Sequence, residues 1–206
     1  MNQSDYSSFD GLGLSAGIKN GDFTIGEIFE AAVNTIESLN PMLNAVVIKN
    51  YENARRSILT SSGALIGVPF LIKDVNVFTH DMPTTFSCRF FDNADPRPDS
   101  EIVKRWRRSG LIVLGKSNTP EFAEDYVCEP TFRGATLNPR NRNLTTGGSS
   151  GGAASVPVIN EDDHIPCAVQ LAGHLGQDHR ILQLSALIER LNPWQTYRPP
   201  IWAGNL

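Results

Sequence analysis

The residue that most directly suggests chemistry is Lys73, which follows the apolar run at 68–72. Burial among apolar neighbours disfavours the charged form of a lysine and lowers its pKa. A neutral lysine can accept the proton of a serine hydroxyl and so act as a general base. Asp74 is adjacent, but neighbouring side chains of an extended backbone point to opposite faces. The alternative interpretation is an ordinary lysine in solvent at the end of a strand.

A second feature is the run of glycines and serines at 147–152, in which two glycine pairs bracket Ser149 and Ser150. Because glycine has no Cβ, such a segment can bring backbone N–H groups and hydroxyls very close to a reacting group. The same composition also makes flexible linkers. A phosphate-binding loop of the Walker type is disfavoured, because the run does not end in Gly-Lys-Ser or Gly-Lys-Thr.

Composition and charge narrow the possible functions further. The net charge is −4 over 206 residues, and no basic stripe indicates a nucleic-acid partner. No apolar run is long enough to span a membrane, and residues 1–10 lack the apolar core of a signal peptide. The three separated cysteines and the four histidines without ligand spacing predict no disulfide framework, metal site or cofactor. We therefore expect a cytoplasmic protein.

The elements that must position these residues follow from the apolar pattern. Apolar residues that recur at helical spacing predict helices at 24–39, 51–59, 100–109 and 178–191. The first of these opens with a capping box formed by Thr24 and Glu27. It should end at Asn40-Pro41, because the residue before a proline avoids the helical region.

Short apolar runs predict the strands. They lie at 67–72, 111–114 and 168–172, whereas 119–146 is expected to be mostly irregular. Helices that give way to strands across a glycine are typical of an α/β layer fold. Lys73 should then lie at the end of the first strand, where a loop can bring the glycine–serine run to it.

The order of several motifs resembles the amidase-signature family of serine amide hydrolases. The N-terminal motifs are Gly-Val-Pro-Phe-Leu-Ile-Lys-Asp at 67–74, Gly-Lys-Ser-Asn-Thr-Pro-Glu-Phe at 115–122, Asn-Pro at 138–139 and the run at 147–152. The C-terminal motifs are Ser-Val-Pro at 155–157, the segment 165–178 and Pro-Trp at 193–194. The motifs are most similar to those of bacterial amidases of the 6-aminohexanoate cyclic dimer hydrolase type. The resemblance implies a mixed sheet flanked by helices and a small carboxamide substrate, linear or cyclic.

The family uses a Ser-cisSer-Lys triad, so the resemblance also implies roles for residues of this chain. It maps the general base to Lys73. It maps the relay serine, which follows a cis peptide bond, to Ser149. Gly147, Gly148 and Ser150 are then expected beside the substrate.

The family's nucleophile has no counterpart in this sequence. It should follow Ser149 in a run such as Asp-Thr-Gly-Gly-Ser, which does not occur here. We therefore expect an internal deletion near 153–155 that joins an N-terminal part of the domain, 1–154, to a C-terminal part, 155–206, with the central strands of the sheet missing. Loss of the nucleophile should leave the chain inactive. The alternative is a non-catalytic assembly or binding fragment, whose open sheet edge is completed by a complementing chain or by a second copy in a homo-oligomer.

Overall fold

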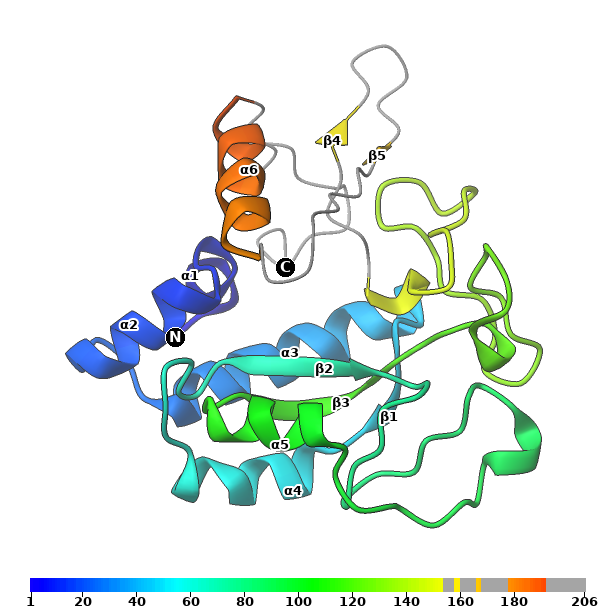
Figure 1. Ribbon diagram of the computed structural model, residues 1–206, viewed down its shortest axis with the longest axis horizontal. Coiled ribbons are helices and arrows are strands. Elements are labelled where there is room, and N and C mark those ends of the chain that lie inside the picture. The colour runs from blue at the N-terminus through cyan, green and yellow to red at the C-terminus, as the bar shows by residue number, and fades with distance from the viewer. Residues whose placement is uncertain (154–157, 160–165, 168–177, 192–206) are drawn as a thin grey trace. The chain divides into compact units, whose positions relative to one another are not determined.

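A computed structural model describes residues 1–153, 158–159, 166–167 and 178–191 of the chain (Figure 1). The described residues fall into two units, the first made of 1–153 and the second of the three later segments. The first unit is an α/β structure that holds the sheet, and the second holds a two-stranded ladder and one helix. Among the residues described, no helix is long and apolar enough to cross a membrane.

Three helices open the first unit. They are α1 (Gln3–Ser8), α2 (Gly11–Asn20) and α3 (Ile25–Leu43). The side chains of Asn2 and Asp10 cap α1 and α2 by accepting backbone N–H groups. The predicted capping box of Thr24 and Glu27 is confirmed at the start of α3. The helices α1 and α2 were not predicted from the sequence.

The predicted end of α3 at Asn40-Pro41 is wrong, since the helix continues to Leu43 with Pro41 inside it. Its end is fixed instead by Asn44, which adopts the left-handed conformation with φ 51° and donates its N–H to the Asn40 carbonyl. The Asn40 side chain adds a second restraint, because its Oδ1 accepts the N–H groups of Ala45 and Val46, each at 2.8 Å. Pro41 is therefore tolerated in the last turn of α3, where hydrogen bonds of Asn40 and Asn44 fix the backbone at the end of the helix.

The sheet has three strands in the order β1-β3-β2. They are β1 (Val46–Lys49), β2 (Pro69–Lys73) and β3 (Ile112–Ser117). β1 runs antiparallel to β3, and β2 runs parallel to it with Lys73 opposite Ser117. Strands were predicted at the positions of β2 and β3, although β3 extends three residues beyond the predicted end at 114. β1 was not predicted, because its four residues, three apolar and one lysine, show no clear alternation of apolar and polar side chains.

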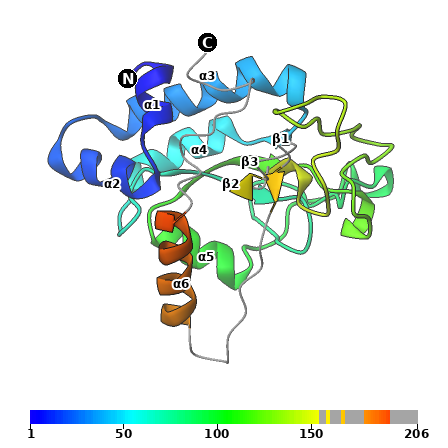
Figure 2. The same cartoon turned by 90° about the horizontal axis from the view of Figure 1, so that it is seen from above.

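Helices cover both faces of the sheet. The remaining helices of the first unit are α4 (Tyr51–Ser57), which a 3-10 turn extends through Thr60, and α5 (Glu101–Arg108). Side chains of α3 and α4 pack against Ile112 and Leu114 of β3, whereas α5 packs against Val113 through Val103. Because alternate residues of a strand point to opposite faces, α3 and α4 form one layer and α5 the other. Figure 2 shows this order of layers.

The second unit is small. The strands β4 (Val158–Ile159) and β5 (Pro166–Cys167) pair antiparallel, and α6 spans Asp178–Leu191, as predicted for 178–191. The predicted strand at 168–172 lies outside the described residues.

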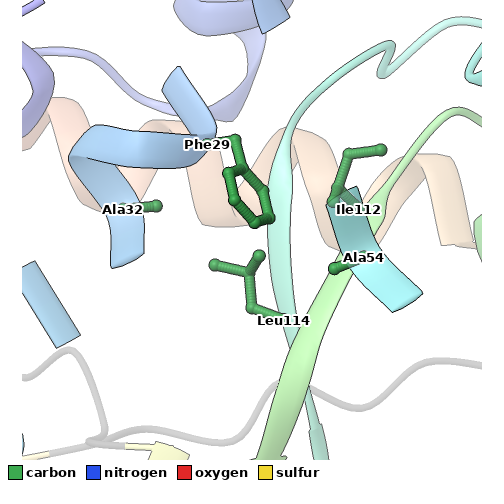
Figure 3. Packing of buried hydrophobic residues seen from close by; sticks show 5 residues of the cluster. All are labelled: Phe29, Ala32, Ala54, Ile112 and Leu114. Atoms are coloured by element: carbon green, nitrogen blue, oxygen red, sulfur yellow. The ribbon is translucent and has the colours of Figure 1, made fainter. Parts of the chain in front are cut away.

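The core between α3, α4 and β3 offers a test of the packing. Phe29, Ala32, Ala54, Ile112 and Leu114 meet there (Figure 3). Ile112 is 2% exposed, so we expect Ile112→Val to lower the free energy of unfolding by about 0.5–1.5 kcal/mol. Ile102→Val removes the same methyl group at a site that is 44% exposed, and should change the free energy of unfolding by less than about 0.5 kcal/mol. Urea denaturation measures both, and equal losses would contradict the assignment of Ile112 to the core.

Candidate active site

Lys73 and the glycine–serine run meet in the structure. Lys73 is the last residue of β2 and is half-buried. Its ammonium nitrogen donates to the Ser149 hydroxyl at 2.6 Å and to the Ser150 hydroxyl at 3.0 Å. The sequence separation across these contacts is 76 and 77 residues, so the fold alone brings the groups together. The interpretation of Lys73 as a solvent lysine and that of 147–152 as a loose linker both disagree with this geometry.

The surroundings of Lys73 favour its neutral form. Burial lowers the pKa of the Lys73 ammonium, because an ammonium loses hydration there, and the neighbouring Cys128 opposes this effect weakly. Cys128 is buried, and burial raises the pKa of its thiol. No carboxylate is paired with Lys73 among the described residues. The amine is therefore suited to accept a proton.

The glycines of the run are required by close backbone contacts. A Cβ at Gly148 would lie 2.6 Å from the Asp125 carbonyl oxygen, and one at Gly152 would lie 2.4 Å from the Asn118 nitrogen. Gly147 has φ 74°, which glycine adopts at little cost. The peptide bond between Gly148 and Ser149 is cis. The run is thus packed tightly between the segment 125–127 and the end of β3.

Asp74 points away from Lys73, as the strand geometry predicts. It is fully buried and accepts the N–H of Thr85 at 2.8 Å as well as the Thr85 hydroxyl. Lys116 lies 4.0 Å from this carboxylate and donates to Thr84 and to the Val77 carbonyl. Burial lowers the pKa of Lys116 to about 8, while Asp74 and then Asp81 oppose the shift. This buried pair connects β2 and β3 on the side of the sheet opposite the site.

A pocket of about 680 Å³ lies beside Lys73 along β2. Its lining is mostly apolar and includes Leu71 from one face of β2, and Phe70 with Trp106 from the other. Lys73 and Ser150 also line it. Because residues from both faces of β2 contribute, the pocket runs along the edge of that strand.

The predicted site residues divide into two groups in the structure. Lys73, Ser149 and Ser150 are together, whereas Gly147 and Gly148 shape the run and do not line the pocket beside Lys73. Sequence reasoning missed the bonds that Asn118 and Thr119 make to the run, although both residues lie in the motif at 115–122. It also missed Cys128, which gives no signal as a single cysteine.

In the described part of the chain, the serine hydroxyls that accept from the Lys73 ammonium are those of Ser149 and Ser150. Ser185 belongs to α6, and its hydroxyl donates to the Ile181 carbonyl at 2.9 Å, within the same helix. Ser155 lies outside the described residues. Within the described segments, no three side chains of His, Cys, Asp or Glu gather as a metal site requires.

Comparison with known proteins adds independent information. The model of the Amidase family matches residues 27–156. The 6-aminohexanoate-cyclic-dimer hydrolase of Paenarthrobacter ureafaciens is 37% identical over 154 residues, which cover 71% of this chain and 31% of that protein. One subunit of the glutamyl-tRNA(Gln) amidotransferase of Lachnospira eligens is 36% identical over 170 residues, 78% of this chain and 34% of the other.

Solved structures show the same similarity. A 6-aminohexanoate cyclic dimer hydrolase complexed with substrate matches with a TM-score of 0.69 and 35% identity, over 72% of this chain and 32% of that one. A bacterial aryl acylamidase of the amidase-signature family matches with a TM-score of 0.69 and 29% identity, over 73% and 33%. The chain thus spans about a third of the length of the relatives it matches.

Proposed function

The chain belongs to the amidase-signature family, and from this we propose that it carries the proton-transfer half of an amide-hydrolysing site. Lys73 is the general base and Ser149 is the relay serine. The observation that carries this assignment is the 2.6 Å contact from the Lys73 ammonium to the Ser149 hydroxyl, at a lysine whose pKa burial lowers.

The proposed chemistry follows from this contact. Neutral Lys73 accepts the proton of the Ser149 hydroxyl, and Ser149 takes a proton in turn from a nucleophilic serine that attacks the carbonyl carbon. The same groups return the proton to the leaving nitrogen when the C–N bond breaks. Both steps use only lysine and serine, so the proposal needs no metal or cofactor. Linear or cyclic carboxamides are the proposed substrate class, with Gly147, Gly148 and Ser150 beside the substrate.

These 206 residues do not supply the nucleophile in this proposal. A nucleophile and its oxyanion donors act as a unit with the base, so the base and relay alone give almost no catalysis. We propose that the family's nucleophile loop is lost between the parts 1–154 and 155–206. The chain by itself is then inactive towards amides.

The titration of Lys73 tests the assignment of the base. In protein labelled with ¹³C at the lysine Cε positions, we expect Lys73 to titrate with a midpoint below the ordinary 10.5, because burial disfavours the ammonium. Lys73→Arg identifies the signal by its loss. Ser149→Ala should move the midpoint, whereas Ser57→Ala should not, since the half-buried Ser57 hydroxyl donates to the Ala54 carbonyl. A Lys73 midpoint at or above 10.5 would sink the role of this lysine as base.

A second candidate function is assembly with another chain. Among the described strands, β2 pairs only with β3, and the apolar pocket runs along its other edge. An open edge beside apolar side chains favours the addition of a strand. Sedimentation velocity of the chain, alone and with a polypeptide that spans the unmatched part of the Paenarthrobacter ureafaciens relative, separates the outcomes. A monomer that ignores this polypeptide would argue against assembly.

A further inference from the structure

The end of β3 holds the glycine–serine run at two points. The Thr119 hydroxyl donates to the Ser149 carbonyl at 3.1 Å, and the Asn118 carbonyl accepts the Gly152 N–H at 3.3 Å. Asn118 and Thr119 are both fully buried. Two consecutive residues therefore fix the first and last residues of the segment 149–152.

Both polar groups of the Asn118 side chain make hydrogen bonds. Its Nδ2 donates to the Gly134 carbonyl and to the Thr136 hydroxyl, each at 3.0 Å. Its Oδ1 accepts the Ser87 hydroxyl at 3.1 Å and the Thr119 N–H at 3.0 Å. A buried amide that satisfies its donors and acceptors has one stable orientation. The backbone that carries Thr119 is therefore rigid.

The same strand end also fixes Lys73. Lys73 lies opposite Ser117 in the sheet, and the Asp74 N–H donates to the Ser117 carbonyl at 3.1 Å. Three residues in sequence, Ser117, Asn118 and Thr119, thus bond to the strand of the lysine on one side and to the serine run on the other. The distance from Lys73 to Ser149 is set through this segment.

We propose that Thr119 is a positioning residue, whose hydroxyl holds Ser149 against Lys73 by fixing the Ser149 carbonyl. The inference rests on the proposed function, in which the contact between lysine and serine transfers the proton. Thr119 touches neither the lysine amine nor the serine hydroxyl, so it acts through the serine backbone.

The test compares Thr119→Val with Ser149→Ala in the full chain, with the Lys73 titration midpoint as the readout. Valine keeps the shape of threonine and removes only the hydroxyl. We expect Thr119→Val to move the midpoint in the same direction as Ser149→Ala, and the double variant to show no shift beyond that of Ser149→Ala. Thr119→Ser, which restores the hydroxyl, should return the midpoint to that of the unmodified chain.

Thr79→Val is the matched control. Thr79 is also fully buried, and its hydroxyl donates to the Met82 carbonyl at the same 3.1 Å, so its loss should leave the Lys73 midpoint unchanged. If Thr119→Val does not fold, Thr119→Ala serves for the same comparison. A midpoint that moves with Ser149→Ala but not with Thr119→Val overturns the positioning role alone. A midpoint that ignores Ser149→Ala overturns both this role and the proposed relay.

Discussion

Replacing Lys116 with methionine is expected to lower the free energy of unfolding by about 3–5 kcal/mol at pH 7, because it leaves the Asp74 carboxylate buried without its cation. Both side chains are fully buried, so water cannot take the place of the lost ammonium. Methionine keeps most of the apolar volume of lysine, which limits the cost of a cavity. Urea denaturation measures the change.

A second variant separates charge from packing. Adding Asp74→Asn to Lys116→Met removes the unpaired charge, and we expect the double variant to recover about 1–3 kcal/mol of the loss. Asparagine can still accept the Thr85 N–H that Asp74 accepts. A double variant that is less stable than Lys116→Met by the full cost of Asp74→Asn would show that the two groups are not coupled.

The lowered pKa of Lys116 predicts how the stability of the fold depends on pH. Burial lowers the pKa of Lys116 to about 8 in the folded chain, from its ordinary 10.5. Between these values the unfolded chain binds more protons, so stability should rise as the pH increases through this window. Burial raises the pKa of Tyr6 to about 12, so stability should fall again above pH 10, where only the unfolded chain loses that proton. In Lys116→Met the rise between pH 8 and 10 should be smaller.

The second large effect concerns catalysis. We expect this 206-residue chain to hydrolyse 6-aminohexanoate cyclic dimer on the order of 10⁶-fold more slowly than the Paenarthrobacter ureafaciens relative, because the proposed deletion removes the nucleophile. The relative assayed beside it provides the positive control. Product release measured by chromatography over long incubations gives the rate.

Variants of the chain show whether Lys73 and Ser149 contribute to any residual rate of hydrolysis. If the base and relay have no nucleophile to activate, Lys73→Ala and Ser149→Ala should leave the residual rate where it is. A rate that exceeds that of buffer and falls in Lys73→Ala would contradict the proposed loss of the nucleophile.

Much of the frame that positions Lys73 could be predicted from the sequence. The apolar run before Lys73 and the glycine that follows α5 are local signals, and they correctly placed β2 and β3. The strand β1 was missed because its pairing with β3 is set by contacts distant in sequence. The caps Asn2 and Asp10 could have indicated α1 and α2, since both residue types favour helix starts.

The candidate site could also be predicted in part. Lys73 and the run at 147–152 could be named, because the order of the motifs resembles a known family. The buried polar groups around them could not be. Lys116 lies near the end of β3 and Asn118 directly follows that strand, where a polar residue is ordinarily taken to face solvent. Only the fold shows that their partners Asp74, Thr84 and Thr136 surround them.

The most direct test of the central claim is treatment of the purified chain with a fluorophosphonate probe, beside Lys73→Ala as a control. The probe reacts covalently with activated serines. We predict that the folded chain is not labelled, since the proposed loss of the nucleophile loop leaves Lys73 and Ser149 with no serine to activate. Labelling that disappears in Lys73→Ala would show that a serine of this chain is activated by that lysine, and would contradict the account.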